Sequence, residues 1–343
     1  MIHLGIDTSN YKTSLAAVDE SCNIIANISE YLDVQIGERG LRQSDAFFKH
    51  SNKLPDLLNR VLSDVDKSEI ASVGVSTRPR RVEGSYMPCF RAGINLANVL
   101  SDILRVPVYE FSHQEGHAAA IIEGGSADIN ESVLLMHLSG GTTEFLSCKA
   151  DADGYEMNIL GGTLDISFGQ LLDRFGVALG LPFPSGMYID KLASSYSGYE
   201  APGVVPGVRI LDAYFNLSGP ETRLLEFALN HGKNIGEGEI SADIASIYSE
   251  DVKAVSYELM DRIAELLVKS ADILATEYKI EKVYMAGGVA SSETIRKLIS
   301  EKHNDYTYNI IFGDPILSSD NAVGTALLSR RIHNNRYNET GKR

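Results

Sequence analysis

Two histidines stand four residues apart in the sequence His113-Gln114-Glu115-Gly116-His117. Residues with this spacing share one face of a helix, so the two imidazoles could bind a single metal ion. A zinc-protease function has little chemical support, because the general-base Glu of those enzymes follows the first His directly and Gln114 takes that place here. The pair therefore predicts either a metal site or a purely structural helix start, with Ser112 as N-cap and Glu115 in the first turn.

Glycine-rich turns are the second feature that could do chemistry. The turn Ser139-Gly140-Gly141-Thr142-Thr143 lies between two strand-like runs, and its small residues would let backbone N–H groups approach a phosphate. A second turn contains Gly287 and Gly288 and leads into a helix near Ser292, where an adenine or ribose could rest. Ordinary tight turns also use glycine, but two such turns in corresponding places of a duplicated chain favour nucleotide binding.

A repeated pattern of strands and helices must position these residues. Residues 2–29 read as strand, small-residue turn, strand, acidic turn and strand, and residues 132–160 repeat the same order. A long helical pattern follows each copy, at 45–65 and at 249–279, and each of these is followed by a short strand. We therefore expect an α/β fold built from two duplicated units.

Composition excludes several kinds of protein. The chain has 343 residues, of which 44% are hydrophobic, and no apolar run near the roughly 20 residues of a membrane span, so we expect no membrane association and a cytoplasmic location. Three isolated cysteines predict reduced thiols rather than disulfides. The net charge of −15 opposes broad binding to nucleic acid, so any RNA contact would need a partner or a local basic patch, such as Arg78-Pro79-Arg80-Arg81 or the C-terminal tail.

Ordered motifs run through nearly the whole chain: Gly5-Ile6-Asp7-Thr8-Ser9, His113-x-x-x-His117, Ser139-Gly140-Gly141, Thr163-Leu164-Asp165, Leu179 to Gly186, Phe215-x-x-Ser218-Gly219, Gly287-Gly288-Val289 and Ser319-Asp320-Asn321-Ala322. Together they resemble the TsaD family, the transferases that make threonylcarbamoyladenosine in tRNA. The resemblance implies an actin-like ATPase (ASKHA) fold, with two duplicated ribonuclease-H-like domains around a nucleotide and metal cleft. The implied first domain is 1–108 plus 322–343, and the second is 109–321 with helical insertions.

The resemblance also implies a role for each matching residue. His113, His117 and Asp320 match the metal ligands of the family, a set of two nitrogens and one oxygen that favours iron over zinc. An adenine nucleotide or adenylate would be bound by residues His137, Leu138, Ser139, Gly140, Gly141, Asp173, Gly186, Asp190, Gly287, Gly288 and Ser292. The implied reaction moves a threonylcarbamoyl or carbamoyl group from the adenylate to an acceptor, in the first place a tRNA adenosine. TsaB-like and TsaE-like subunits are the implied partners, and tRNA would be bound through them.

Several positions depart from the family pattern. Where the family has an acidic pair after the first strand, this chain has Tyr11 and Lys12, which we expect to be the catalytic side chains of a divergent paralogue. The family's Gly-Pro-Gly-Leu loop is replaced around Arg78 to Gly84, and Ser292 replaces an Asn. Lys12, Arg80 or Arg81 could pair with a phosphate or carboxylate of a different substrate, or could be solvated surface charges.

Two other functions remain open at this point. One is O-carbamoylation of a small molecule, as in the carbamoyltransferases related to HypF, which share the fold and the histidine metal site. The other is a nucleotide-binding assembly protein without transfer chemistry. Loss of the acidic pair favours the assembly protein, whereas retention of His113, His117 and Asp320 favours an enzyme.

Overall fold

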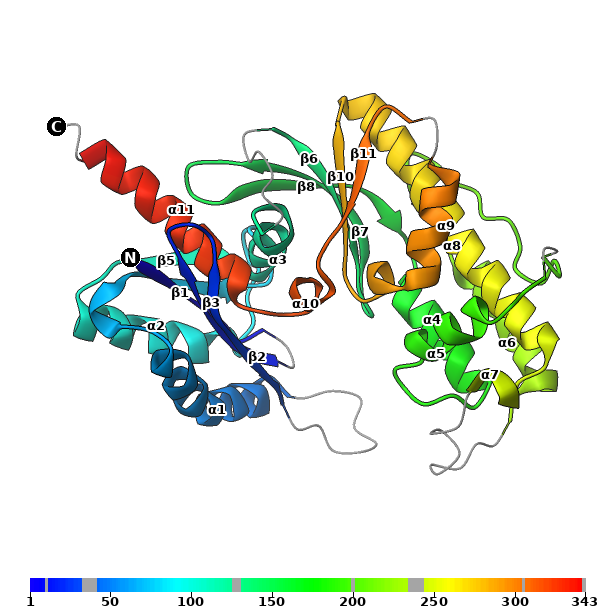
Figure 1. Cartoon of the computed structure of the whole chain (residues 1–343), viewed down its shortest axis with the longest axis horizontal. Helices are drawn as coiled ribbons and strands as arrows, with labels where there is room; N and C mark the ends of the chain where they lie inside the picture. Colours follow the sequence, from blue (N-terminus) through cyan, green and yellow to red (C-terminus); the bar gives the residue numbers. More distant parts are fainter. Residues whose placement is uncertain are drawn as a thin grey trace. The chain divides into compact units, whose positions relative to one another are not determined.

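The computed structural model describes residues 1–9, 12–32, 42–124, 131–198, 201–233, 244–303 and 306–340. The chain divides into two compact units, and each is built on one β-sheet with helices packed against it (Figure 1). Unit 1 contains Met1–Glu131, Cys148–Met157 and Ile316–Arg343, and unit 2 contains Ser132–Ser147 and Asn158–Pro315. The predicted α/β fold with two sheet-based units is therefore confirmed.

The sheet of unit 1 has five strands in the order β3-β2-β1-β4-β5. Its strands are β1 (Ile2–Asp7), β2 (Lys12–Asp19), β3 (Ile24–Tyr31), β4 (Ile70–Arg78) and β5 (Val108–Ser112). The first three strands are antiparallel neighbours, whereas β4 pairs parallel with both β1 and β5. Every residue of β1 is buried, as expected for a central strand that is covered on both faces.

Helices cover both faces of this sheet: α1 (Gln43–Ser63), α2 (Phe90–Leu104), α3 (His113–Ile122) and α11 (Val323–Thr340), with a short η1 (Lys67–Glu69) before β4. Leu4 and Ile6 pack with buried residues of α1 and α2, and the intervening Gly5 faces α11 on the other side. A Cβ at Gly5 would clash with the backbone oxygen of Ala322, so a glycine is needed for α11 to lie this close to the sheet. Figure 1 shows α1 and α2 on one side of the sheet and α11, in red, on the other.

The sheet of unit 2 has six strands in the order β11-β10-β6-β7-β8-β9. Its strands are β6 (Val133–Leu138), β7 (Thr143–Ala150), β8 (Tyr155–Thr163), β9 (Tyr214–Phe215), β10 (Lys282–Ala286) and β11 (Asn309–Phe312). The helices of this unit are α4 (Phe168–Ala178), α5 (Gly186–Ser194), α6 (Ser218–His231), α7 (Ile244–Ile247), α8 (Glu250–Tyr278), η2 (Val289–Ser291) and α9 (Glu293–Lys302), and the short α10 (Pro315–Ser318) that follows β11 lies mostly in unit 1. The three-strand pattern of β1 to β3 thus recurs in β6 to β8, and the long helical patterns of the sequence correspond to α1 and α8.

The unit boundaries differ from those expected from the resemblance, which placed residue 109 onward in the second domain. Residues 109–131, 148–157 and 316–321 belong to unit 1. The reason is that β5 completes the first sheet beside β4, and that α3 packs closely on α11, where a Cβ at Gly324 would clash with the backbone oxygen of Gly116. None of the helices in the described residues is long and apolar enough to cross a membrane.

Candidate metal centre and nucleotide-binding turns

The first turn of α3 is built as the sequence predicted. The Ser112 hydroxyl accepts a hydrogen bond from the Glu115 backbone N–H at 3.2 Å, and Glu115 Oε2 accepts one from the Ser112 backbone N–H at 2.8 Å. This capping box begins the helix at His113, directly after β5. The structural helix start and the metal site, which the sequence left as alternatives, are therefore compatible in one element.

Three potential metal ligands converge in unit 1. The Nε2 atoms of His113 and His117 lie 3.0 Å apart, and Asp320 Oδ1 lies 3.1 Å from His117 Nε2 and 3.6 Å from His113 Nε2. Two ligands that are each about 2.0–2.2 Å from one ion lie roughly 3–3.5 Å from each other, so these separations fit donors around a shared metal. Two imidazole nitrogens and one carboxylate oxygen suit a divalent iron or zinc ion.

Asp7, at the end of β1, contacts the first of these histidines. The two carboxylate oxygens of Asp7 lie 3.2 and 3.3 Å from His113 Nδ1. The Ser9 hydroxyl donates a hydrogen bond to Asp7 Oδ2 at 2.5 Å. A carboxylate that binds the second nitrogen of a ligating histidine fixes the orientation of the ring. In the sequence, Asp7 stands out only as part of the motif Gly5-Ile6-Asp7-Thr8-Ser9. Its position at the carboxyl end of a buried strand, next to parallel β4, was the signal that could have identified it.

Electrostatics at this cluster favour ionised carboxylates and cations. Burial alone would lower the pKa of His113, but the charge of Asp7 and hydrogen bonds to Asp320 and Asp7 outweigh burial and raise that pKa to about 10. Burial opposes ionisation of Asp320, yet its hydrogen bonds with His113 and His117 hold its pKa well below the ordinary value. The two carboxylates are thus ionised and stabilise a positive charge next to them.

Lys12 lies beside this cluster. Its Nζ donates to the Ser319 hydroxyl at 3.2 Å and lies 5.2 Å from the centre of the Tyr31 ring. Burial lowers the pKa of Lys12, while the charges of Asp320 and Asp7 act in the opposite direction. The side chain is therefore largely buried next to the candidate ligands and is not a solvated surface charge. Its neighbour Tyr11 lies outside the described residues.

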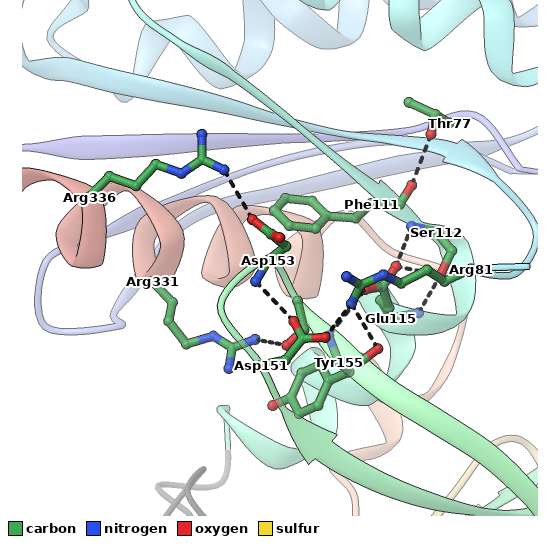
Figure 2. A network of polar contacts seen from close by, with 11 residues as sticks. Thr77, Arg81, Phe111, Ser112, Glu115, Asp151, Asp153, Tyr155, Arg331 and Arg336 are labelled. Atoms are coloured by element: carbon green, nitrogen blue, oxygen red, sulfur yellow. Dashed lines mark hydrogen bonds and ion pairs between the residues drawn. The ribbon is translucent and has the colours of Figure 1, made fainter.

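Arg81 is bonded to other residues of unit 1. Its guanidinium donates to Asp151 Oδ2 at 2.7 Å and to the Tyr155 backbone oxygen at 3.2 Å, and it lies 3.5 Å from Glu115 Oε1 (Figure 2). Internal acceptors therefore bind one guanidinium nitrogen of Arg81, whose side chain is 35% exposed.

In unit 2, the first glycine-rich turn presents open backbone. Ser139 N donates to the Thr142 carbonyl at 2.9 Å, and Thr142 N donates back to the Ser139 hydroxyl at 3.0 Å. A Cβ at Gly140 or Gly141 would meet no atom within 4 Å, so both glycines border open space. The helix α4 begins against this turn, where the Ser167 hydroxyl donates to the Gly140 carbonyl at 2.7 Å.

The second glycine-rich turn packs against the first. Gly287 has a φ of +107°, and a Cβ there would clash with the carbonyl of Leu138, whereas a Cβ at Gly288 would meet nothing within 4 Å. His137 pairs with Ala286 across β6 and β10. The predicted residues 137–141 and 287–288 are therefore neighbours in unit 2.

The remaining predicted nucleotide residues form pairs along α4, α5 and α9. Asp173 accepts from the backbone N–H of Ser185, next to Gly186, at 2.7 Å. Asp190 accepts from the Ser292 hydroxyl at 2.8 Å and from the Glu293 and Thr294 backbone N–H groups at 3.2 Å each. Asp190 and Ser292 thus meet, and their side chains are bonded to each other and to the first turn of α9.

The chain has two sheet-and-helix units, with a candidate metal centre in one and glycine-rich turns in the other, and its likeness to solved structures shows that the fold is of the actin-like ATPase type. The solved structure of HypF from T. kodakarensis has the same fold, with a TM-score of 0.57 at 12% identity over 99% of this chain and 48% of that chain. A glucokinase from Streptomyces griseus gives a TM-score of 0.50 at 13% identity over 96% of this chain and all of that chain.

Sequence comparison gives the family. The family model described as "TsaD: tRNA N6-adenosine threonylcarbamoyltransferase" matches residues 23–327, and the chain belongs to this family. A tRNA N6-adenosine threonylcarbamoyltransferase of Thermotoga neapolitana is 28% identical, over 94% of this chain and 91% of that protein. The corresponding protein of Methanopyrus kandleri is also 28% identical, over 97% of this chain and 88% of that protein.

A third relative, from Thermoplasma volcanium, is named a probable bifunctional tRNA threonylcarbamoyladenosine biosynthesis protein and is 26% identical over 94% of this chain and 55% of its own length. Membership of the family implies an acyltransferase that uses a divalent metal and a substrate derived from ATP. It also implies work in a tRNA-modification complex with other subunits. The predicted family, fold class and enzyme class are therefore confirmed.

Proposed function

We propose that this chain transfers a threonylcarbamoyl group from an adenylate to the N6 atom of a tRNA adenosine. The observation that supports this most is the convergence of His113, His117 and Asp320 in a chain that belongs to the TsaD family. These three side chains would hold one divalent metal, with iron favoured over zinc. When bound, such an ion would polarise the reacting carbonyl.

Unit 2 binds the adenylate in this proposal. The open backbone at Gly140, Gly141 and Gly288 leaves room for a phosphate and a sugar to approach the main chain. Asp173 and Gly186, with Asp190 and Ser292, hold the helix ends that border the adenosine. The amine nitrogen then forms a bond to the carbonyl carbon, AMP leaves with the electron pair of the broken C–O bond, and N6 loses a proton.

In unit 1, the protein's own groups orient the reaction. Asp7 holds the Nδ1 side of His113 and so aims Nε2 toward Asp320. Lys12 contributes a positive charge that suits the carboxylate of the threonyl group. The departures at Tyr11 and Lys12 therefore alter how the substrate is held, while the class of reaction stays the same.

Partner subunits complete the proposal. The net charge of −15 disfavours binding of tRNA by this chain alone, so TsaB-like and TsaE-like subunits are proposed to present the tRNA, in the cytoplasm. No observation favours the two alternatives. The likeness to HypF, at 12% identity, concerns the fold alone and does not support O-carbamoylation of a small molecule. Nothing described favours an assembly protein without transfer chemistry.

The test is reconstitution with TsaB-like and TsaE-like subunits, ATP, the threonylcarbamoyl-adenylate and unmodified tRNA, followed by mass spectrometry of the nucleosides. We expect N6-threonylcarbamoyladenosine with the natural chain and with Glu69→Ala, an exposed acid on η1, and a loss with Asp320→Ala. If the natural chain forms none while a TsaD relative does under the same conditions, the proposal is wrong. Carbamoylation of a hydroxyl compound, in a parallel reaction supplied with a carbamoyl-adenylate, would then point to the small-molecule alternative.

A further inference from the structure

The end of the β7–β8 hairpin is bonded to the helix that carries both candidate histidine ligands. The Tyr155 backbone N–H donates to Glu115 Oε1 at 3.1 Å, and the Arg81 guanidinium lies 3.5 Å from the same oxygen. The other oxygen, Oε2, accepts from the backbone N–H and the hydroxyl of Ser112 at 2.8 and 2.7 Å. Glu115 therefore uses one oxygen to begin α3 and the other to bind the hairpin (Figure 2).

Arg81, in the loop between β4 and α2, contacts both the hairpin and Glu115. One guanidinium nitrogen donates to Asp151 Oδ2 at 2.7 Å and to the Tyr155 carbonyl at 3.2 Å, so it bridges both sides of the turn to Glu115. Figure 2 shows this guanidinium between Asp151, Tyr155 and Glu115.

Gly154 shows how close the hairpin and α3 lie. Its φ is +156°, and a Cβ at this position would clash with Glu115 Oε1. The Gly154 carbonyl in turn accepts a hydrogen bond from Arg331 of α11 at 2.8 Å. The hairpin is therefore held in direct contact with the Glu115 carboxylate, with no space for another group between them.

We propose that Arg81 is a positioning residue for the metal centre. The Glu115 side chain is 2% exposed, and a buried carboxylate that loses its cationic partner pays a desolvation cost and tends to move. Glu115 stands between His113 and His117 in the first turn of α3, so its movement shifts both imidazoles. Arg81 thus acts on the ligands through Glu115 and touches neither the metal nor the substrate. This inference rests on the metal centre of the proposed function.

The experiment compares Arg81→Gln with Arg336→Gln in the full chain. Arg336 of α11 pairs with Asp153 on the same hairpin end at 3.1 Å, and its side chain is 59% exposed, so the control removes an equal charge that contacts the same hairpin. Co²⁺ is added to metal-free protein, and its dissociation constant and visible absorption spectrum are measured. Hydrogen exchange of the backbone amides of residues 113–117 is followed in the same proteins without metal.

We expect Arg81→Gln to weaken Co²⁺ binding about ten-fold, to alter the spectrum and to speed exchange, because loss of groups that orient ligands typically costs 10–100-fold in metal affinity. Arg336→Gln should stay within about two-fold of the natural chain, since exposed ion pairs contribute little. A second variant, Asp151→Asn, removes the negative charge of the side chain that accepts the shortest hydrogen bond of Arg81, and it should shift all readouts in the same direction.

The inference would be overturned if folded Arg81→Gln protein had the same Co²⁺ affinity, absorption spectrum and hydrogen-exchange rates as the natural chain. If the natural chain itself binds no Co²⁺, the proposed metal centre fails instead. The exchange measurement then decides separately for Arg81: faster exchange at residues 113–117 in Arg81→Gln alone supports its role in holding α3, and unchanged exchange overturns it.

Discussion

Replacement of Gly140 by valine tests whether the first glycine-rich turn binds a nucleotide. A Cβ at Gly140 would meet no atom within 4 Å, so the new side chain projects into open space and should leave the fold intact. The same branched side chain would stand where a phosphate must approach the backbone. We expect Gly140→Val to weaken binding of ATP or AMP at least about ten-fold, or about 1.4 kcal/mol.

The assay is isothermal titration calorimetry of ATP and AMP, with circular dichroism and a thermal melt to verify folding. Gly207→Val is the matched control, because Gly207 also borders open space in unit 2 but lies outside both predicted turns. It should bind nucleotide as the natural chain does. Unchanged nucleotide affinity in folded Gly140→Val protein would refute the assignment, because the valine side chain would block a phosphate from the backbone of this turn.

Two further predictions concern carboxylates at strand ends. Asp7→Asn should weaken metal binding about 10–100-fold without preventing folding, because an amide orients the His113 ring less strongly than a carboxylate does. Competition with a chromophoric chelator measures this affinity, and an unchanged affinity would contradict the role of Asp7. Asp165→Ala should lower the free energy of unfolding by about 1 kcal/mol at pH 7. The reason is that the Asp165 carboxylate accepts hydrogen bonds from the backbone N–H groups of Leu217 and Ser218 at the start of α6. Partial burial would raise the pKa of Asp165, but those hydrogen bonds hold it well below the ordinary value, so the stabilisation is present above about pH 4 and declines as the pH falls further. A difference from the natural chain that stays constant down to pH 3 in urea titrations would contradict this account.

Local patterns in the sequence were sufficient for much of the fold. The capping residues Ser112 and Glu115, three residues apart, predicted the start of α3, and the paired strand patterns predicted the duplicated units. These signals are local because hydrogen bonds in a helix turn and side-chain alternation in a strand involve near neighbours in the chain.

Contacts between distant residues were not predictable in the same way. Asp7 and His113 are 106 residues apart, and Arg81 and Asp151 are 70 residues apart. Their meeting depends on how β1, β5 and the β7–β8 hairpin are arranged, which one sequence does not specify. The contacts of Arg81 were not predicted for this reason, since a cation in a loop resembles a solvated or substrate-binding group until its acceptors are known.

Metal content and transfer activity, measured in the same preparations, test the central claim most directly. The natural chain and His117→Ala are purified without chelator, analysed for iron and zinc, and assayed for N6-threonylcarbamoyladenosine in tRNA with the partner subunits. We predict close to one metal ion per natural chain, and a parallel loss of metal and product in His117→Ala, because His117 Nε2 lies 3.0–3.1 Å from both other ligand atoms. Equal metal content in the two proteins would contradict the proposed centre.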